Sequence, residues 1–311
     1  MRCVQSLVDA LGHAQDQVAT RAQLAAIGFG ESAVRTQLRA GRWAKLGAKV
    51  VVMHNGPLTR AQREWAALLA AGPGAGLAGL TALELGGLRR WHDEAVHVIA
   101  ARGRTPRSAG SVKIVVHETR VPASGQLEFV GSPPRTPAAR AAIDAATWSR
   151  DIRTACGLLA AVVQQRLSTG PRLLAALEAA GPVRFRRLLK LALLDICGGA
   201  HALSEIDFVK LCRRNSLGRV THQAVRLDPF GRRRYLDAVI ESPSGAVIAC
   251  EVDGALHLLA ETYWADMARG NELVIAGEAV LRFSTLAMRT EESRVVDQIR
   301  RGLEAVERRA S

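Results

Sequence analysis

The stretch Ile248–His257 reads IACEVDGALH, an apolar segment that ends in two carboxylates, a glycine and a histidine. Its apolar run predicts a buried strand, and Gly254 predicts the point where the chain leaves that strand sharply. Side chains alternate along a strand, so Glu251 and Asp253 share one face. Acidic residues are seldom buried without a partner, so this strand indicates a site as well as a core.

The strand before it carries a third acid. RRRYLDAVIE precedes AVIACEVD, and the connecting SPSG predicts a hairpin that places Asp237 opposite residue 250 or 251. Converging carboxylates repel one another unless a cation neutralises them, and oxygen ligands select Mg²⁺ or Mn²⁺. Such a metal activates water and stabilises charge on a phosphoryl group. Glu205, on a predicted helix from Ser204 to Leu217 that Ser204 caps, is a further candidate for this site.

From about Ser204 to Leu303, the chain resembles the very-short-patch-repair-endonuclease-like branch of the PD-(D/E)XK nuclease superfamily. The resemblance is carried by a helical Glu, YLDAVI, IACEVDGALH, a helix and VLRFS. It implies metal binding by Asp237 and Glu251, assisted by Glu205. Asp253 occupies the position where the superfamily usually has lysine, and the ExDG…H pattern of this branch makes His257 the candidate general base or phosphate contact. Asp266 and Arg269 are implied as supporting residues, three apart on a helix.

Each of these residues also has an ordinary structural interpretation. Asp237 alone would suit a strand end, and His257 alone would suit a helix start. Asp266 and Arg269 would form a surface ion pair of little energetic value. The ordered set on successive elements is what favours a nuclease-like site.

Positive charge is concentrated outside this region. Residues 1–60 hold 8 Lys/Arg against 3 Asp/Glu, residues 61–200 hold 18 against 10, and residues 201–311 hold 16 against 16. A basic excess favours a polyanion such as nucleic acid, because phosphate contacts release condensed counterions. An Arg-rich composition bias is the alternative, although it does not account for the neutral last third.

The first part of the chain predicts a helix, a turn, a second helix and a short strand pair. Thr20 caps the first helix, Gly28-Phe29-Gly30 forms the turn, and Ser32 caps the second helix, which Gly41 ends. Val34 and Leu38 point inward, and GRWAKLGAKVVVM follows as a basic turn and a strand. This order is typical of a winged helix-turn-helix, with a plain helical hairpin as the alternative. The candidate DNA-binding residues are Ser32, Arg35, Thr36, Arg39, Arg42 and Lys45.

The segment from Val18 to Met53 resembles the N-terminal winged helix of the AbiEi-like antitoxins of type IV abortive-infection systems, with GLAGLTALELGGL similar to the region that follows it. In that family the domain acts as a DNA-binding autorepressor. Here AKVVVM replaces the aromatic strand that is usual there. The resemblance implies double-stranded DNA, and a cognate toxin, as partners.

The length and the amino-acid composition of the chain fit a soluble, multi-domain protein. Of 311 residues, 48% are hydrophobic and 23% are charged, and the apolar runs fall short of a membrane span. Asp9, His13 and Asp16 interrupt the stretch that a secretory signal would need, so a cytoplasmic location without membrane partners is expected. The five cysteines are scattered, which favours reduced thiols over disulfides or structural zinc.

The expected fold is therefore a multi-domain α/β chain. Its four segments are a winged helix-turn-helix (1–58), an α+β extension (59–135), a helical region (136–202) and a restriction-endonuclease-like α/β domain with a mixed sheet (203–311). The expected function is DNA binding with Mg²⁺- or Mn²⁺-dependent phosphodiester hydrolysis, in phage defence or DNA repair. The alternative is a non-catalytic regulator or antitoxin that keeps the nuclease fold as a scaffold. A homodimer is compatible with either.

Overall fold

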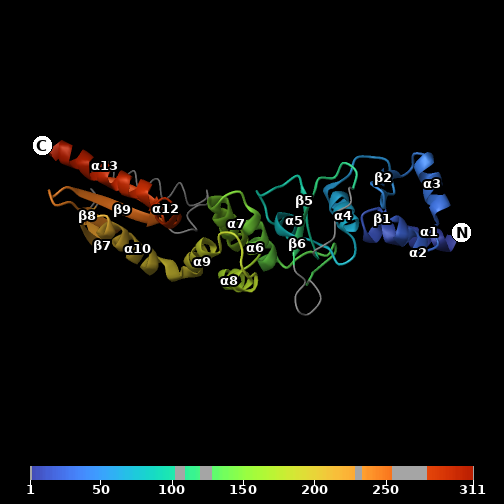
Figure 1. Ribbon diagram of the computed structural model, residues 1–311, viewed down its shortest axis with the longest axis horizontal. Helices are drawn as coiled ribbons and strands as arrows, with labels where there is room; N and C mark the ends of the chain where they lie inside the picture. Colours follow the sequence, from blue (N-terminus) through green and yellow to red (C-terminus); the bar gives the residue numbers. More distant parts are fainter. Residues whose placement is uncertain (1, 102–108, 120–127, 228–232, 254–278, 311) are drawn as a thin grey trace. The chain divides into compact units, whose positions relative to one another are not determined.

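A computed structural model gives the architecture of residues 2–101, 109–119, 128–227, 233–253 and 279–310 (Figure 1). It is a mixed α/β structure with three sheets among these residues. The chain divides into two compact units, Met1–Ala145 and Ala146–Ser311. In the part of the chain given above, no helix is long and apolar enough to cross a membrane.

The first unit opens with three helices and a small antiparallel sheet. The sheet has the strand order β1-β3-β2, with Val18 opposite Val52 and Leu46 opposite Val50. The helices lie around a cluster that includes Val8, Leu24 and Val34. The elements are α1 (Arg2–Ala14), β1 (Val18–Thr20), α2 (Arg21–Ala26), α3 (Glu31–Arg39), β2 (Ala44–Leu46) and β3 (Val50–Val52).

Two of the predicted helix ends are confirmed and one is wrong. Thr20 caps α2 through a capping box in which its hydroxyl accepts from the backbone N–H of Gln23. Gly41 follows the end of α3 with a φ of +66°, a conformation that glycine adopts without strain. Ser32, however, is not a cap: α3 begins at Glu31 and extended Gly30 is its N-cap, without a side-chain hydrogen bond.

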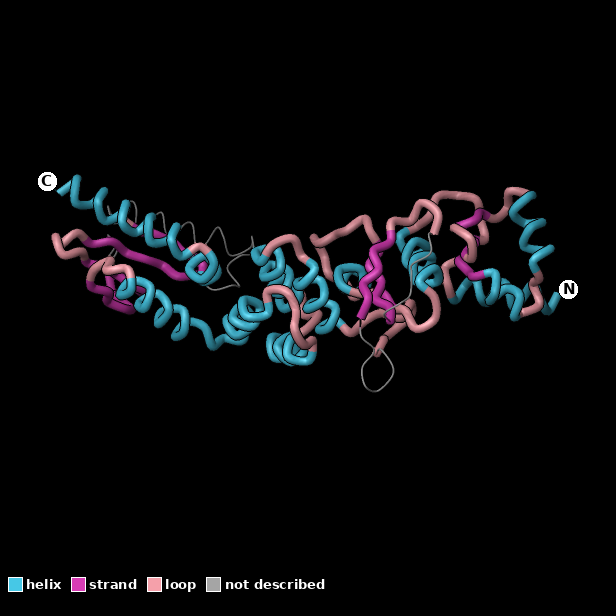
Figure 2. The backbone as a smooth tube through the Cα atoms, in the orientation of Figure 1, coloured by secondary structure: helices cyan, strands magenta, loops and turns pink. Residues whose placement is uncertain are grey.

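The second part of this unit is an α+β layer. Thr59 caps α4 (Arg60–Ala71) with another capping box, and α4 packs against β5. The sheet has the order β4-β5-β6, with β5 and β6 parallel, and these two strands lie side by side as magenta segments in Figure 2. The remaining elements are β4 (Gly76–Leu77), α5 (Gly79–Leu85), β5 (Val96–Ala101) and β6 (Ile114–Thr119). These helices and strands lie within the segment expected to be an α+β extension (59–135).

A helical region follows this sheet along the chain. α6 (Ala138–Trp148) spans the boundary between the units, and the helices that follow it belong to the second unit. Helix α8 begins at Gly170 and has Pro171 in its first turn, a position that proline favours. These helices are α7 (Ile152–Gln164), α8 (Gly170–Ala179), α9 (Arg186–Leu194), the π-helical turn η1 (Asp195–Gly199) and α10 (Ala200–Arg214).

The second unit ends in a four-stranded mixed sheet of order β10-β9-β8-β7. The strands β7 to β9 form an antiparallel meander, and β10 pairs in parallel with β9. The predicted hairpin at Ser242–Gly245 is confirmed, whereas β7 was not expected from the sequence. The strands are β7 (Arg219–Leu227), β8 (Arg233–Glu241), β9 (Val247–Asp253) and β10 (Val280–Ser284).

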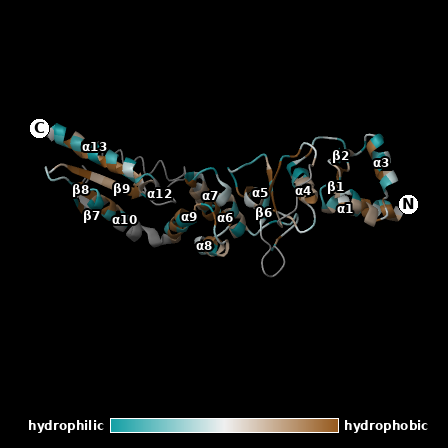
Figure 3. Cartoon of the chain, in the orientation of Figure 1, coloured by the Kyte–Doolittle hydropathy of each residue, from teal (hydrophilic) through white to brown (hydrophobic). Residues whose placement is uncertain are grey.

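Helices α10 and α13 (Glu292–Ala310) cover one face of this sheet. Phe208, Cys250 and Ile299 are fully buried there in one cluster. Helix α13 is amphipathic, and polar and apolar residues alternate along its length in Figure 3. Because α10 begins at Ala200, Ser204 lies inside the helix, and its predicted role as a cap is wrong. The short α12 (Thr285–Thr290) precedes α13.

Candidate nucleic-acid interface and carboxylate site

Helix α3 has a buried face and an exposed face. Val34 has 1% of its surface exposed, and Leu38 is half-buried against the same cluster. The expected inner face is therefore confirmed. Packing on this side turns the opposite side of the helix toward solvent.

The predicted DNA-binding residues of α3 lie away from this core. Ser32 and Arg35 are exposed, Thr36 and Arg39 lie on the same side of the helix, and their spacing of three and four residues places them on one face. The Thr36 hydroxyl donates to the backbone oxygen of Ser32 at 3.0 Å, so it is held against the helix. The two guanidinium groups are the long, charged members of this face.

The segment after α3 adds more positive charge. Arg42 and Lys45 are both exposed, and Arg42 Nε donates to Oε1 of Gln37 at 2.6 Å. Trp43 stacks on Phe29 with ring centroids 5.3 Å apart. The stack joins the turn before α3 to the segment after it, which holds the basic residues of this segment close to the helix. We call the set Arg35, Arg39, Arg42 and Lys45 the basic face.

An ion pair connects the starts of α2 and α3. Nη1 of Arg21 lies against Oε1 of Glu31, with 23% and 51% of the two side chains exposed. Arg21 is the first residue of α2 and Glu31 the first residue of α3. The pair therefore ties the helix that carries the basic face to its neighbour. It was not predicted from the sequence.

The predicted carboxylate site lies on the second-unit sheet. Ala238 pairs with Cys250, so continuing this antiparallel register by one residue places the backbone of Asp237 beside that of Glu251. Ala238 and Cys250 belong to the cluster under the helices, and strand alternation assigns position 251 to the other face. The side chain of Asp237 lies outside the described part of the structure.

Glu251 already has a cationic partner. Arg282 of β10 stands opposite Glu251 in the parallel register, and its Nη2 lies 2.8 Å from Oε2 of Glu251. The two side chains are 27% and 13% exposed, so the pair is largely shielded from water. The guanidinium neutralises the carboxylate that was expected to bind a metal. Arg282 was not among the predicted site residues, because the partner of β9 cannot be read from the sequence alone.

The structure does not describe the other members of the predicted site in atomic detail. Asp253 and Glu205 have their backbones in β9 and α10, with side chains outside the described set. His257, Asp266 and Arg269 lie outside the described residues altogether. Among the side chains that are described, no three His, Cys, Asp or Glu residues come together as a metal site. Glu251, paired with Arg282, does not by itself fit Mg²⁺ or Mn²⁺.

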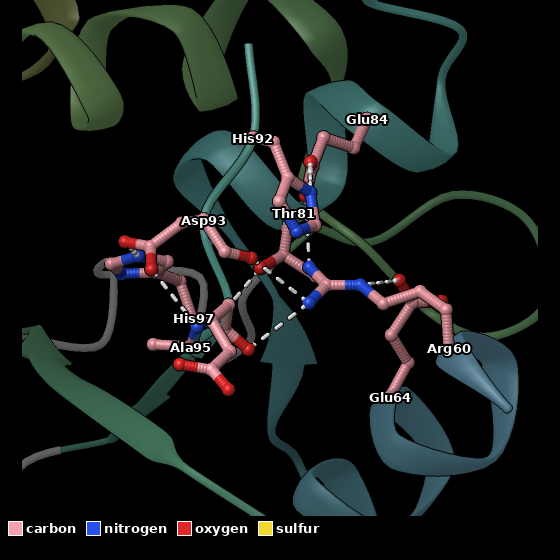
Figure 4. A network of polar contacts seen from close by, with 9 residues as sticks. Arg60, Glu64, Thr81, Glu84, His92, Asp93, Ala95 and His97 are labelled. Carbon is pink, nitrogen blue, oxygen red and sulfur yellow. Dashed lines mark hydrogen bonds and ion pairs between the residues drawn. The ribbon is translucent and has the colours of Figure 1, made fainter. Parts of the chain in front are cut away.

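A polar network in the first unit was not predicted from the sequence (Figure 4). Arg60 donates to Glu64 at 3.0 Å and to Glu84 at 2.8 Å, and its Nη1 also donates to the backbone oxygen of Asp93 at 3.0 Å. Burial raises the pKa of Glu64, against the lowering effect of Arg60. One arginine thus joins α4 and α5 to the segment before β5.

Two histidines extend this network across the sheet. Nε2 of His97 lies 3.0 Å from Oδ2 of Asp93, and Nδ1 of His97 lies 2.9 Å from Nε2 of His117. An ionised carboxylate only accepts, so His97 donates to Asp93 and His117 donates to His97. Burial, and then the charge of His97, lower the pKa of His117 to about 4. The segment WHDEAVHV contains His97 and Asp93, but the partner strand that brings His117 could not be inferred from it.

Comparison with known proteins adds little to this geometry. No family model matches the chain, and no curated protein matches it. Among solved structures, the crystal structure of the RV2827C protein from Mycobacterium tuberculosis is similar with a TM-score of 0.36 and 17% sequence identity, over 63% of this chain and 75% of that chain. A TM-score at that level does not establish a shared fold.

Proposed function

We propose that this chain binds double-stranded DNA through the basic face. The observation that supports the proposal is the set of cationic side chains on the outer side of α3 and just after it. The order α1-β1-α2-α3-β2-β3 with a β1-β3-β2 sheet is the arrangement expected of a winged helix-turn-helix. In such a domain the second helix of the motif enters the major groove and the wing follows the backbone.

Three residues of the basic face, and two short polar residues beside them on α3, have defined roles in this proposal. Arg35 and Arg39 reach base edges or phosphates in the groove, and Lys45 on β2 contacts phosphate. Ser32 and Thr36 are short enough to let the helix approach the duplex closely. Phosphate contacts supply affinity that falls as salt is raised, because bound counterions are released on association.

The test is a salt titration of duplex binding by the Arg35→Ala/Arg39→Ala variant, followed by fluorescence anisotropy. We expect affinity to fall by about tenfold or more, and the slope of log K against log salt to flatten by about 0.9 for each phosphate that the variant no longer neutralises. The matched control is Arg172→Ala/Arg187→Ala, which removes two arginines from the second unit. Equal reductions of affinity in both variants would show that binding depends on overall charge and would contradict the proposal.

A second candidate function is metal-dependent hydrolysis of DNA by the second unit. It is supported by the antiparallel pairing of β8 with β9, in which Ala238 and Cys250, the chain neighbours of Asp237 and Glu251, stand opposite each other, and by the parallel β10, which gives the mixed sheet expected of the nuclease-like domain. Asp237 and Glu251 would hold Mg²⁺ or Mn²⁺, which would activate water for attack on a phosphodiester. Glu205, Asp253 and His257 would assist, with Asp266 and Arg269 in support. Arg282 would have to release Glu251 first.

Nicking of supercoiled plasmid separates this candidate from a non-catalytic regulator or antitoxin. A nuclease cuts with Mg²⁺ or Mn²⁺ and loses that activity in Asp237→Ala and in Glu251→Ala, while both variants keep their affinity for duplex DNA. A regulator binds the duplex and leaves it uncut under every condition. In that case the second unit is a scaffold, and a toxin or a second copy of the chain becomes the partner to seek.

A further inference from the structure

The first unit contains a groove beside the DNA-binding helices that the proposed function does not use. Its volume is about 1030 Å³, which is enough for a small organic ligand. It lies among the start of α2, the turn between β2 and β3, the end of α4 and the glycine-rich loop after α4. Its lining includes Arg21, Lys49, Trp65, Leu68 and Leu69.

The lining of this groove is apolar on one side and cationic on the other. Trp65 and Leu68 are 7% and 4% exposed, and half-buried Leu69 lies beside them on α4. Arg21 and exposed Lys49 supply positive charge, and none of the described residues that line the groove is acidic. A ligand that matches both sides has an apolar body and one acidic group.

Arg21 connects this groove to α3. Its Nη1 is paired with Glu31, and its Nε is buried with no hydrogen-bond partner among the described residues. A buried donor that lacks a partner is costly, so this guanidinium gains from an added acceptor. Arg21 lines the groove while its Nη1 is paired with Glu31, so an anionic acceptor in the groove competes with Glu31 for the same guanidinium.

We propose that this groove binds a small organic anion with an aromatic or aliphatic body, and that the ligand takes Arg21 from Glu31 and thereby weakens DNA binding by α3. The second half of the proposal rests on the proposed function, because it concerns regulation of the basic face. The first half stands on the groove alone. By linkage, DNA would weaken binding of the anion by the same factor.

The first experiment is calorimetric titration of the full chain with 1-naphthoate and, separately, with its neutral counterpart 1-naphthamide. We expect naphthoate to bind about tenfold or more tightly than the amide, because the amide cannot form charged hydrogen bonds with Arg21. Arg21→Gln and Lys49→Gln should each weaken naphthoate binding. Lys113→Gln, which removes an exposed lysine of the same unit outside the groove, should not. Absence of naphthoate binding, or equal binding of the two compounds, overturns the site.

The second experiment measures duplex affinity with and without saturating 1-naphthoate. Because exposed ion pairs are weak, we expect the ligand to lower DNA affinity only about two- to fivefold. The effect should disappear in Glu31→Gln, which has no ion pair to lose. Naphthoate binding that leaves DNA affinity unchanged overturns the regulatory half. A chain that binds naphthoate and no DNA contradicts the proposed function instead, so the two failures are distinguishable.

Discussion

Charged side chains on the outer side of α3 are exposed to solvent, whereas the charge of Glu251 on the second-unit sheet is paired and shielded. Arg35 and Arg39 lie on the outer side of the helix, and neither forms an ion pair within the described part of the chain. Glu251 is largely buried and held by Arg282. Cations near solvent keep their field where a polyanion can meet them, whereas a shielded pair cancels its own field. The contrast explains why DNA binding is the better supported proposal, since metal binding by Glu251 would first require its separation from Arg282.

The largest expected change in the free energy of unfolding comes from truncating a buried side chain between the second-unit sheet and its helices. Phe208 is fully buried and stacks on Phe283 with centroids 6.4 Å apart. Phe208→Ala should destabilise the second unit by about 3–5 kcal/mol, through reduced burial and the cavity left behind. Scanning calorimetry measures that change, and duplex affinity at a temperature where both units are folded should remain at the wild-type value. A parallel fall in affinity would break the comparison, because it would show that the sheet contributes to DNA binding.

Arg282→Met tests whether the ion pair neutralises Glu251 as described. The variant keeps an apolar side chain of similar length and removes the cation from a partly shielded carboxylate. We expect a loss of about 2 kcal/mol in unfolding free energy, between the values for exposed and buried pairs. Urea unfolding of Arg282→Met and of the Arg282→Met/Glu251→Gln double variant measures it. Recovery of stability in the double variant is the expected result, and a further loss would mean that Glu251 is stabilised mainly by other groups.

The imidazole of His117 stays unprotonated in the folded first unit, because its surroundings lower its pKa. Its pKa is about 4 in the folded chain against 6.5 for a free histidine, so the unfolded chain takes up the proton first as pH falls. Stability is therefore lost between pH 6.5 and pH 4 and is unaffected above that window. Because the side chain is only half-buried, we expect a loss of about 1–2 kcal/mol. Urea unfolding at pH 7 and near pH 4 should show a smaller acid loss in His117→Gln; an identical loss would contradict the assignment.

The smallest expected change in stability tests which residues cap α2 and α3. Thr20→Ala removes the capping box of α2 and should cost about 1 kcal/mol, whereas Ser32→Ala removes no capping bond and should cost less than about 0.5 kcal/mol. Thermal unfolding of the two variants provides the comparison. Equal costs would indicate that Ser32 stabilises the start of α3 in solution.

Local signals in the sequence predict much of the fold. Thr20 and Thr59 combine a hydroxyl with a glutamine three residues later, and both form the capping boxes that this spacing favours. The hairpin at Ser242–Gly245 follows from turn residues between two apolar runs. The outer face of α3 follows from helical periodicity, so the basic side chains of the candidate interface could be identified from the sequence.

The features that were predicted wrongly or missed depend on the surrounding structure rather than on the local sequence. Ser32 has a capping side chain, but the N-cap is Gly30, two residues earlier, and the first residue of α3 is Glu31, which pairs with Arg21. Ser204 also has a capping side chain, but the sequence around it does not show that the preceding residues are already helical, from η1 into α10. The ion pair between Glu251 and Arg282 depends on the parallel register of β10, which is set by tertiary packing. The same limitation applies to His97 and His117 on β5 and β6.

The first and last sheets along the chain also differ in the order in which they can be completed. Every strand of the β1-β3-β2 sheet lies between residues 18 and 52, so its contacts close short loops. The other sheet needs β10, which begins at Val280 and pairs with β9. Short-range contacts form faster than long-range ones, and chains fold from the N-terminal end as they are synthesised. The segment that carries the basic face can therefore assemble on the ribosome while the strand that brings Arg282 to Glu251 has yet to be translated.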